Sequence, residues 1–151
     1  ASIRGVELRG DAGLPWAGFS MHGALAWTEG RDHVRDQPLN SIDPAKLTLG
    51  VVYVTPGDRH RFEIVGTAIA RKDEVATAMP AAFETPGTGL VDAYWRWQLS
   101  DSIALDVGAF NLGDRRWWSW SSVRGLAANA REIDLATQPG RHVAVNVQWQ
   151  W

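Results

Sequence analysis

The sequence closes on the ten residues His142-Val143-Ala144-Val145-Asn146-Val147-Gln148-Trp149-Gln150-Trp151. Val or Trp occupies every second position, and His, Ala, Asn and Gln fill the positions between them. A period of two residues is that of a β-strand, in which successive side chains point to opposite faces of a sheet. The stretch therefore predicts a strand with one apolar and one polar face.

Six earlier stretches alternate in a similar way. Leu47, Leu49 and Val51, for example, share one face of the stretch 47–53. The remaining stretches are residues 2–11, 19–27, 62–70, 91–99 and 103–110. No segment repeats its apolar residues with the 3.6-residue period of a helix. We therefore predict an all-β fold with about seven antiparallel strands.

The connections between these strands alternate between short and long. Three are tight turns rich in Gly, Pro, Asp and Ser, at residues 12–15, 55–59 and 100–101. The other three are long, at residues 29–45, 72–87 and 112–139. An up-and-down transmembrane β-barrel has this pattern, with tight turns on one side of the membrane and long loops on the other.

The composition excludes several classes of protein. The 151 residues carry a formal net charge of −2, which gives no electrostatic signature for nucleic acid as a partner. The absence of Cys excludes disulfides and thiolate metal sites. No apolar run reaches 18 residues, so a transmembrane helix is excluded, whereas a membrane-spanning strand is not.

Nine Trp residues are unusually many for a chain of this length. Two bands of Trp at the ends of membrane-spanning strands form an aromatic girdle at the two interfaces. We predict Trp16, Trp149 and Trp151 at the short-turn ends, and Trp27 and Trp117 at the long-loop ends. Trp95 and Trp97 lie further into a predicted strand and fit the girdle less well.

A soluble sandwich or a lipocalin-like barrel is the alternative fold. Each strand has one uncharged apolar face and one polar face, and the polar faces carry Glu63, Asp92, Arg96 and Gln148. A soluble barrel this small would turn its apolar face into a dry core, whereas uncharged apolar faces suit contact with lipid, so the soluble fold is disfavoured. Seven strands cannot close a bacterial barrel, which has an even number of strands. The partner strands are therefore expected on a missing stretch of chain, on another chain or on copies of this one, and the start at Ala1 favours missing chain.

Five ordered motifs resemble the C-terminal part of a TonB-dependent outer-membrane receptor. They are Arg4–Leu8, with its GxE pattern, Pro38–Leu47, Phe83–Gly87, Val107–Asp114 with its G..NL.D pattern, and Pro139–Arg141 before a strand that ends in an aromatic residue. Residues 118–126 further resemble the last loop of the receptors for heme, hemoglobin and hemophores.

The resemblance implies a 22-stranded barrel around an N-terminal plug domain. Residues 1–151 would be the C-terminal portion of that barrel, with the last seven strands, and the plug would lie outside this chain. The short turns would be periplasmic and the long loops extracellular, in the outer membrane of a bacterium.

The implied function is uptake of heme as an iron source: outer loops capture the ligand, and TonB rearranges the plug. The implied partners are the rest of the barrel, the plug, TonB through the plug, outer-membrane lipid and lipopolysaccharide, and heme, hemoglobin or a hemophore. Heme would be the transported ligand and not a bound cofactor. A siderophore receptor of the same family, and a non-transport barrel or adhesin, remain the alternatives.

No catalytic set or metal site is visible in the sequence, so we predict a protein that is not an enzyme. Polar and aromatic residues of the outer loops and the lumen are the candidates for contact with the ligand. They are Arg31, His33, His22, Arg116, Trp118, Trp120 and Arg124.

Each candidate also has a structural interpretation. His22 is better explained as a hydrogen-bonded lumenal side chain, and the cluster 117–120 equally as an anchor of the last hairpin. The arginines of the last loop could pair with propionates, a protein partner or lipopolysaccharide phosphates. His60 is expected to be solvated and His142 to line the lumen. Trp151 resembles the terminal aromatic signal read by the barrel-insertion machinery.

Overall fold

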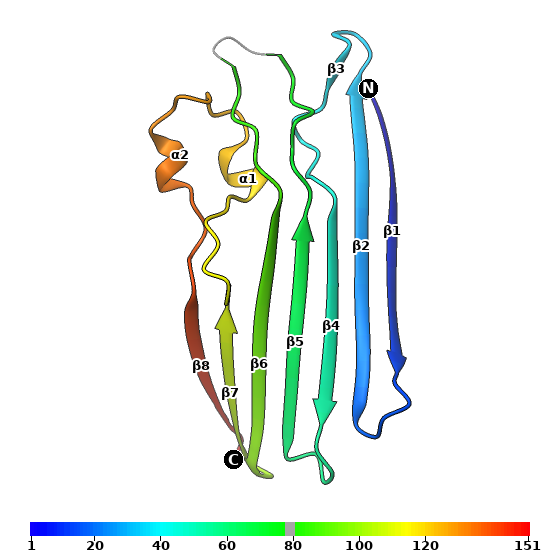
Figure 1. Ribbon diagram of the computed structural model, residues 1–151, viewed down its shortest axis with the longest axis vertical. Coiled ribbons are helices and arrows are strands. Elements are labelled where there is room, and N and C mark those ends of the chain that lie inside the picture. The colour runs from blue at the N-terminus through cyan, green and yellow to red at the C-terminus, as the bar shows by residue number, and fades with distance from the viewer. Residues whose placement is uncertain (78–80) are drawn as a thin grey trace.

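The chain forms one antiparallel sheet in a computed structural model that describes residues 1–77 and 81–151. Seven long strands follow one another in chain order and pair with their neighbours (Figure 1). They are β1 (Ser2–Gly13), β2 (Phe19–Asp32), β4 (Lys46–Val54), β5 (His60–Ile69), β6 (Thr88–Ser100), β7 (Ile103–Phe110) and β8 (His142–Trp149). The short strand β3 (Gln37–Pro38) pairs only with β2, and two one-turn helices, α1 (Trp120–Val123) and α2 (Glu132–Leu135), lie in the last loop.

The predicted all-β, up-and-down arrangement is confirmed, and the tight turns and long loops lie at opposite ends of the sheet in Figure 1. Two boundaries differ. Strand β2 continues to Asp32, beyond the predicted 19–27, because β1 pairs with it as far as Arg31 and β3 folds back to pair with Arg31 and Asp32. Strand β8 ends at Trp149, two residues early, although the Gln150 N–H still donates to the carbonyl of Ser102 (2.9 Å).

The strand register places the apolar residues on one face, which we call the apolar face. Leu25 lies opposite Leu8 and Leu47, and Val107 lies opposite Trp95 and Val145. No second layer in the described part of the chain covers this face, and its residues remain exposed, Ile64 by 60%. The structure contradicts the soluble alternative, because a sandwich would bury this surface against a second sheet.

An aromatic array crosses the apolar face near the short turns. Adjacent rings are stacked from Phe19 through Tyr53 and Phe62 to Trp95, with centroids 4.6, 6.4 and 6.3 Å apart. Trp97 extends the array, 6.0 Å from Trp95.

The array bears on two expectations. Trp95 and Trp97, which fit the predicted girdle less well, lie together in this array, because the register brings Trp95 level with Phe62. His60 is not simply solvated: its ring stacks on both indoles, and its Nδ1 accepts a hydrogen bond from Nε1 of Trp95 (3.3 Å).

The opposite face, the polar face, carries ion pairs and hydrogen bonds between strands. Arg96 pairs with Asp106 of β7 (3.1 Å) and donates to Gln148 of β8 (3.0 Å). His22 of β2 reaches Glu63 of β5 (Nε2 to Oε1, 2.9 Å) across the intervening strand β4. That reach requires Gly50, because a Cβ there would collide with the imidazole ring.

The sheet is a single layer and therefore buries little of its own surface. Val52 and Ala104 are its buried apolar side chains, whereas Trp120, Val123 and Ile133 are buried in the last loop. Within the described residues, no helix combines the length and the hydrophobicity needed to cross a membrane.

Candidate functional site

Three long loops meet at one end of the sheet: loop 33–45, loop 70–87 and loop 111–141. We call their described residues the loop cap; residues 78–80, part of the predicted loop 72–87, lie outside the described residues. Asn40 joins all three loops. Its carbonyl accepts a hydrogen bond from the Trp120 indole (2.8 Å), and its side-chain oxygen accepts one from the Ala76 N–H (2.8 Å).

A short backbone ladder joins the second and third loops. Ala82 and Ala127 form an antiparallel bridge. On either side of it, the Phe83 N–H donates to the carbonyl of Leu126 (2.9 Å), and the Ala128 N–H donates to the carbonyl of Ala81 (2.7 Å). These bonds satisfy backbone groups in the way that a sheet does, so the two loops support each other.

The loop cap has a small core of its own. Trp120, Val123 and Ile133 are 3%, 0% and 8% exposed. The buried Lys72 places its Nζ 5.8 Å from the Trp120 ring centroid, within the range of a cation–π interaction.

The beginning and the end of loop 70–87 are bonded to each other beside this core. Arg71 pairs with Glu84 (2.6 Å), and the Lys72 N–H donates to the carbonyl of Thr85 (2.9 Å). The hydrogen bond and the charge of Glu84 raise the pKa of Arg71.

Asn111 and Asp114 close the base of loop 111–141. Both adopt positive φ (49° and 48°), which Asn and Asp tolerate better than most residues. The buried Asn111 amide donates to the carbonyls of Arg115 (2.8 Å) and Pro139 (3.2 Å). Asp114 accepts the N–H of Arg141 (2.8 Å). The NL.D motif therefore has a mechanical role: it fixes both ends of the last loop.

A pocket of about 200 Å³ lies under the loop cap, at the top of the polar face, and we call it the cap pocket. It is lined by Asp43, Pro44, Lys46, Ile69, Trp117, Trp118, Ser119 and Trp120. Lys46 and Ile69 pair with each other on the polar face. Trp117 thus lines a pocket on the polar-face side, and its place in the girdle stays a prediction.

A larger groove of about 410 Å³ runs along the polar face between β5 and β8. Charged residues line it, including Arg61, Glu63, Arg96 and Asp106. Its aromatic side is built by Tyr94 and Phe110, whose rings meet edge to face at 5.5 Å, and His142 stacks on Phe110 at 4.8 Å. The groove can therefore offer both cations and rings to a molecule that passes along this face.

The predicted ligand-contact residues do not form one site. His22 lies on the polar face in the hydrogen bond with Glu63. Arg31 and His33 lie at the outer end of β2, on the same side of the sheet as the apolar face, as their pairing with Ser2 shows. If the strand alternation of residues 19–27 is continued, Arg31 and His33 fall on the same face as Leu25 and Trp27. Residues 28–33 contain no large apolar residue, however, so the sequence alone predicts a loop there.

The remaining candidates belong to the last loop. Trp118 is half-buried, donates to the carbonyl of Ile133 (2.8 Å) and packs under Arg116, whose guanidinium carbon lies 5.1 Å from the ring centroid. Arg116 also pairs with Asp134 (2.6 Å). Trp120 is buried and therefore closed to a ligand, whereas Arg124 is exposed beyond α1.

Sequence reasoning missed Lys46 as a lining residue and Asn40 and Asn111 as the residues that hold the loops. All three fall in or beside the quoted family motifs, but their partners lie up to 80 residues away, as for Asn40 and Trp120. Among the described residues, no group of three or more His, Asp or Glu side chains is placed to hold a metal ion.

Two curated relatives from Haemophilus influenzae are similar to the chain. Hemoglobin-binding protein A is 22% identical over 100% of this chain and 17% of its own length. Hemoglobin and hemoglobin-haptoglobin-binding protein A is 23% identical over 83% of this chain and 13% of its own length. The chain thus spans less than a fifth of either relative.

Solved structures share the fold. Copper transporter OprC has a TM-score of 0.83 at 19% identity, over 99% of this chain and 24% of its own. The ferripyoverdine receptor of the outer membrane of Pseudomonas aeruginosa has a TM-score of 0.68 at 16% identity, over 97% of this chain and 19% of its own.

Residues 1–112 match the family described as TonB dependent receptor-like, beta-barrel. This match covers most of the chain and includes the first six long strands. The open sheet agrees with this match, since its edge strands β1 and β8 each have one edge that pairs with no other described strand. The chain belongs to the TonB-dependent receptor β-barrel family, whose members are outer-membrane proteins.

Proposed function

We propose that this chain is the C-terminal wall of a TonB-dependent receptor that takes up heme as an iron source. In this proposal the apolar face contacts lipid and the polar face lines the lumen. The loop cap is extracellular and captures the ligand. The plug domain and the segment that contacts TonB belong to other parts of the whole protein.

The cap pocket is the observation that carries the choice of ligand. Its lining includes Trp117 and Trp118 together with Lys46, beside the acidic residue Asp43. Aromatic rings suit a flat, apolar macrocycle, and a cationic side chain suits its carboxylates. The two curated relatives are named for binding hemoglobin, which supports the same choice.

A siderophore is the second candidate ligand. A structural neighbour is a receptor for ferripyoverdine, and another is described as a ferric-catecholate import receptor. The groove on the polar face, with Arg61 and Arg96 beside Tyr94, also suits an anionic aromatic chelate. The two candidates differ in where the ligand is first held: at the cap pocket for heme, and deeper on the wall for a chelate.

The test is a titration of the complete receptor in detergent with heme, followed at the Soret band. We expect Lys46→Gln to weaken heme binding about three- to tenfold, since one charge-assisted contact is lost. Arg59→Gln is the matched control, because Arg59 is exposed at the opposite, short-turn end. A receptor that shows no Soret shift but binds a ferric catecholate would replace heme with the second candidate.

A further inference from the structure

A pocket of about 260 Å³ opens on the outer side of the sheet, above the apolar face. It is lined by Ser2, Arg4, Glu29, Gly30, Arg31 and His33, and we call it the collar site. Because it lies on the opposite side from the groove and the cap pocket, a ligand on its way through the lumen does not meet it.

The register fixes the height of the collar site along the strands. Val6 pairs with Trp27, which is the last apolar pair, and Arg4 then pairs with Glu29. Ser2 pairs with Arg31 two residues further on. A strand rises about 3.3 Å per residue, so these two pairs lie roughly 7 and 13 Å beyond the apolar edge along the strand. Lipid headgroups occupy that level, just outside the hydrocarbon layer.

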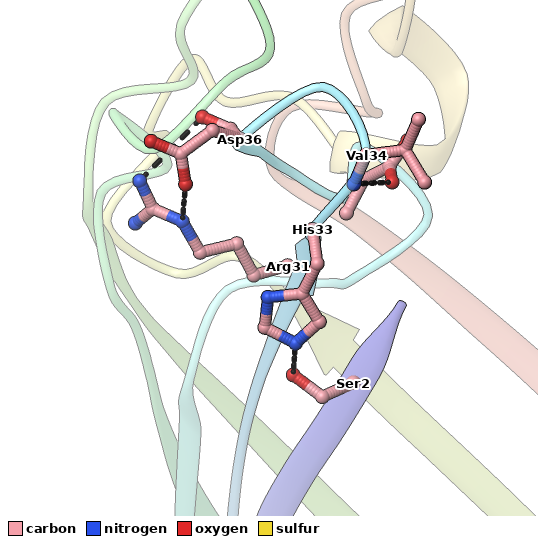
Figure 2. A network of polar contacts seen from close by, with 6 residues as sticks. Ser2, Arg31, His33, Val34 and Asp36 are labelled. Carbon is pink, nitrogen blue, oxygen red and sulfur yellow. Dashed lines mark hydrogen bonds and ion pairs between the residues drawn. The ribbon is translucent and has the colours of Figure 1, made fainter.

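The side chains of the collar site are held in place but keep donors for a ligand. Arg4 uses Nε and Nη2 to bind Glu29 (3.2 and 2.8 Å), which leaves Nη1. Arg31 uses Nε to bind the Asp36 carboxylate (3.0 Å) and Nη2 to reach the Asp36 carbonyl (3.5 Å), and Nε2 of His33 contacts the Ser2 hydroxyl (2.9 Å), as Figure 2 shows. A guanidinium has five N–H donors, so neither ion pair exhausts it.

We propose that the collar site binds the phosphate group of an outer-leaflet lipid headgroup. Two guanidiniums and an imidazole converge on one side of the β1–β2 pair, and Arg matches phosphate oxygens through paired hydrogen bonds. Both arginines are exposed, and exposed ion pairs are weak. A phosphate can therefore replace Glu29 on Arg4, or Asp36 on Arg31, as the hydrogen-bond partner of that guanidinium.

The chain offers a matched contrast on the same strand. Arg9 forms an exposed ion pair with Glu7 (2.7 Å), much as Arg4 does with Glu29. Arg9, however, lies on the polar face, opposite Ala24. A lipid headgroup reaches Arg4 but not Arg9, because Arg9 lies on the other face and five residues further along β1, away from the headgroup level.

The test uses the complete receptor, purified in detergent and titrated with lipid A that carries its phosphates. Native mass spectrometry counts the bound lipid. We expect Arg4→Gln/Arg31→Gln to reduce the bound fraction at least fivefold and Arg9→Gln to leave it unchanged. Lipid A without phosphates should bind all three proteins equally weakly, and heat-modifiable migration on gels shows that each variant folds.

Other outcomes would overturn the proposal. Equal retention of phosphorylated and phosphate-free lipid by the wild type would show that the apolar face alone holds the lipid. Equally tight binding of inorganic phosphate would make the collar site a site for the free anion. An unchanged lipid count in the double variant would remove both arginines from any such role. None of these results depends on whether the receptor transports heme.

Discussion

The seven-stranded sheet, which we call the wall, and the loop cap are stabilised in different ways. The wall is one layer of strands whose apolar side chains stay exposed, and every residue of β1 and β8 is exposed. The loop cap contains far fewer regular hydrogen bonds, but it buries Trp120, Val123 and Ile133. The wall therefore depends on lipid and on neighbouring strands, whereas the cap depends on contacts within the chain.

The largest expected effect is that of Trp120→Ala on the loop cap. The change removes a buried ring and its hydrogen bond to Asn40, a loss of about 3–5 kcal/mol for a large buried aromatic residue. Limited proteolysis of the complete receptor should show cleavage within the three loops. Heat-modifiable migration should stay normal, because the wall does not use this contact.

Trp16→Ala is the control for this prediction, since Trp16 is exposed at the short-turn end. Intact loops in the Trp120→Ala protein would show that the cap does not need its core.

Leu49→Lys reverses the comparison by damaging the wall. Leu49 lies midway along the apolar face, opposite Gly23, and a lysine there would meet hydrocarbon. The expected cost is about 2–4 kcal/mol, as for cations at the bilayer midplane. The measurement is the free energy of unfolding in lipid vesicles from a denaturant titration. Thr48→Lys, one residue away on the polar face, should cost much less. Equal costs would contradict the assignment of the two faces.

Asn111→Ala tests the joint between wall and cap. The substitution removes the hydrogen bonds that the buried Asn111 amide donates to the carbonyls of Arg115 and Pro139, at a cost of roughly 1–3 kcal/mol. Hydrogen exchange should accelerate in residues 112–141 and stay slow in β6 and β7. Asn129→Ala, at an exposed position of the same loop, is the control. Faster exchange throughout β7 would show that the joint also supports the wall.

An effect of the same size as that of Asn111→Ala is expected for Gly50→Ala on the polar face. The new methyl group collides with His22 and displaces it from Glu63, at a cost of about 1–3 kcal/mol. In a His22→Ala background the same change should be nearly neutral, because the space is then empty. A double-mutant cycle on the unfolding free energy measures this coupling. Additive costs would show that the two side chains do not compete for the space.

Sequence reasoning succeeded on the wall because strand alternation is a local signal. The faces of β4, β6, β7 and β8 follow directly from every second residue, and the register confirms them. It failed where the answer depends on a neighbouring strand. Trp95 joins the aromatic array only because Phe62 and His60 lie beside it, and no pattern within residues 91–99 contains that fact.

The loop cap was beyond prediction for a related reason. Its helices are single turns, too short to show a 3.6-residue repeat. Its contacts join residues far apart: the Trp120 indole donates to Asn40 and the Trp118 indole to Ile133. The motif residues Asn40, Asn111 and Asp114 marked the right segments, but their partners emerge only from the folded chain.

Because Asn40 bonds to both of the other loops, the three loops of the cap cannot be redesigned independently. The three loops cannot be exchanged one at a time, because a loop taken from another receptor would lack the residues that bind the two loops left in place. A chimera that transplants loop 33–45, loop 70–87 and loop 111–141 together keeps the bonds of Asn40 to Trp120 and Ala76. Replacing only one of the three loops would remove at least one of these bonds, so the trio is the unit to exchange in a chimera.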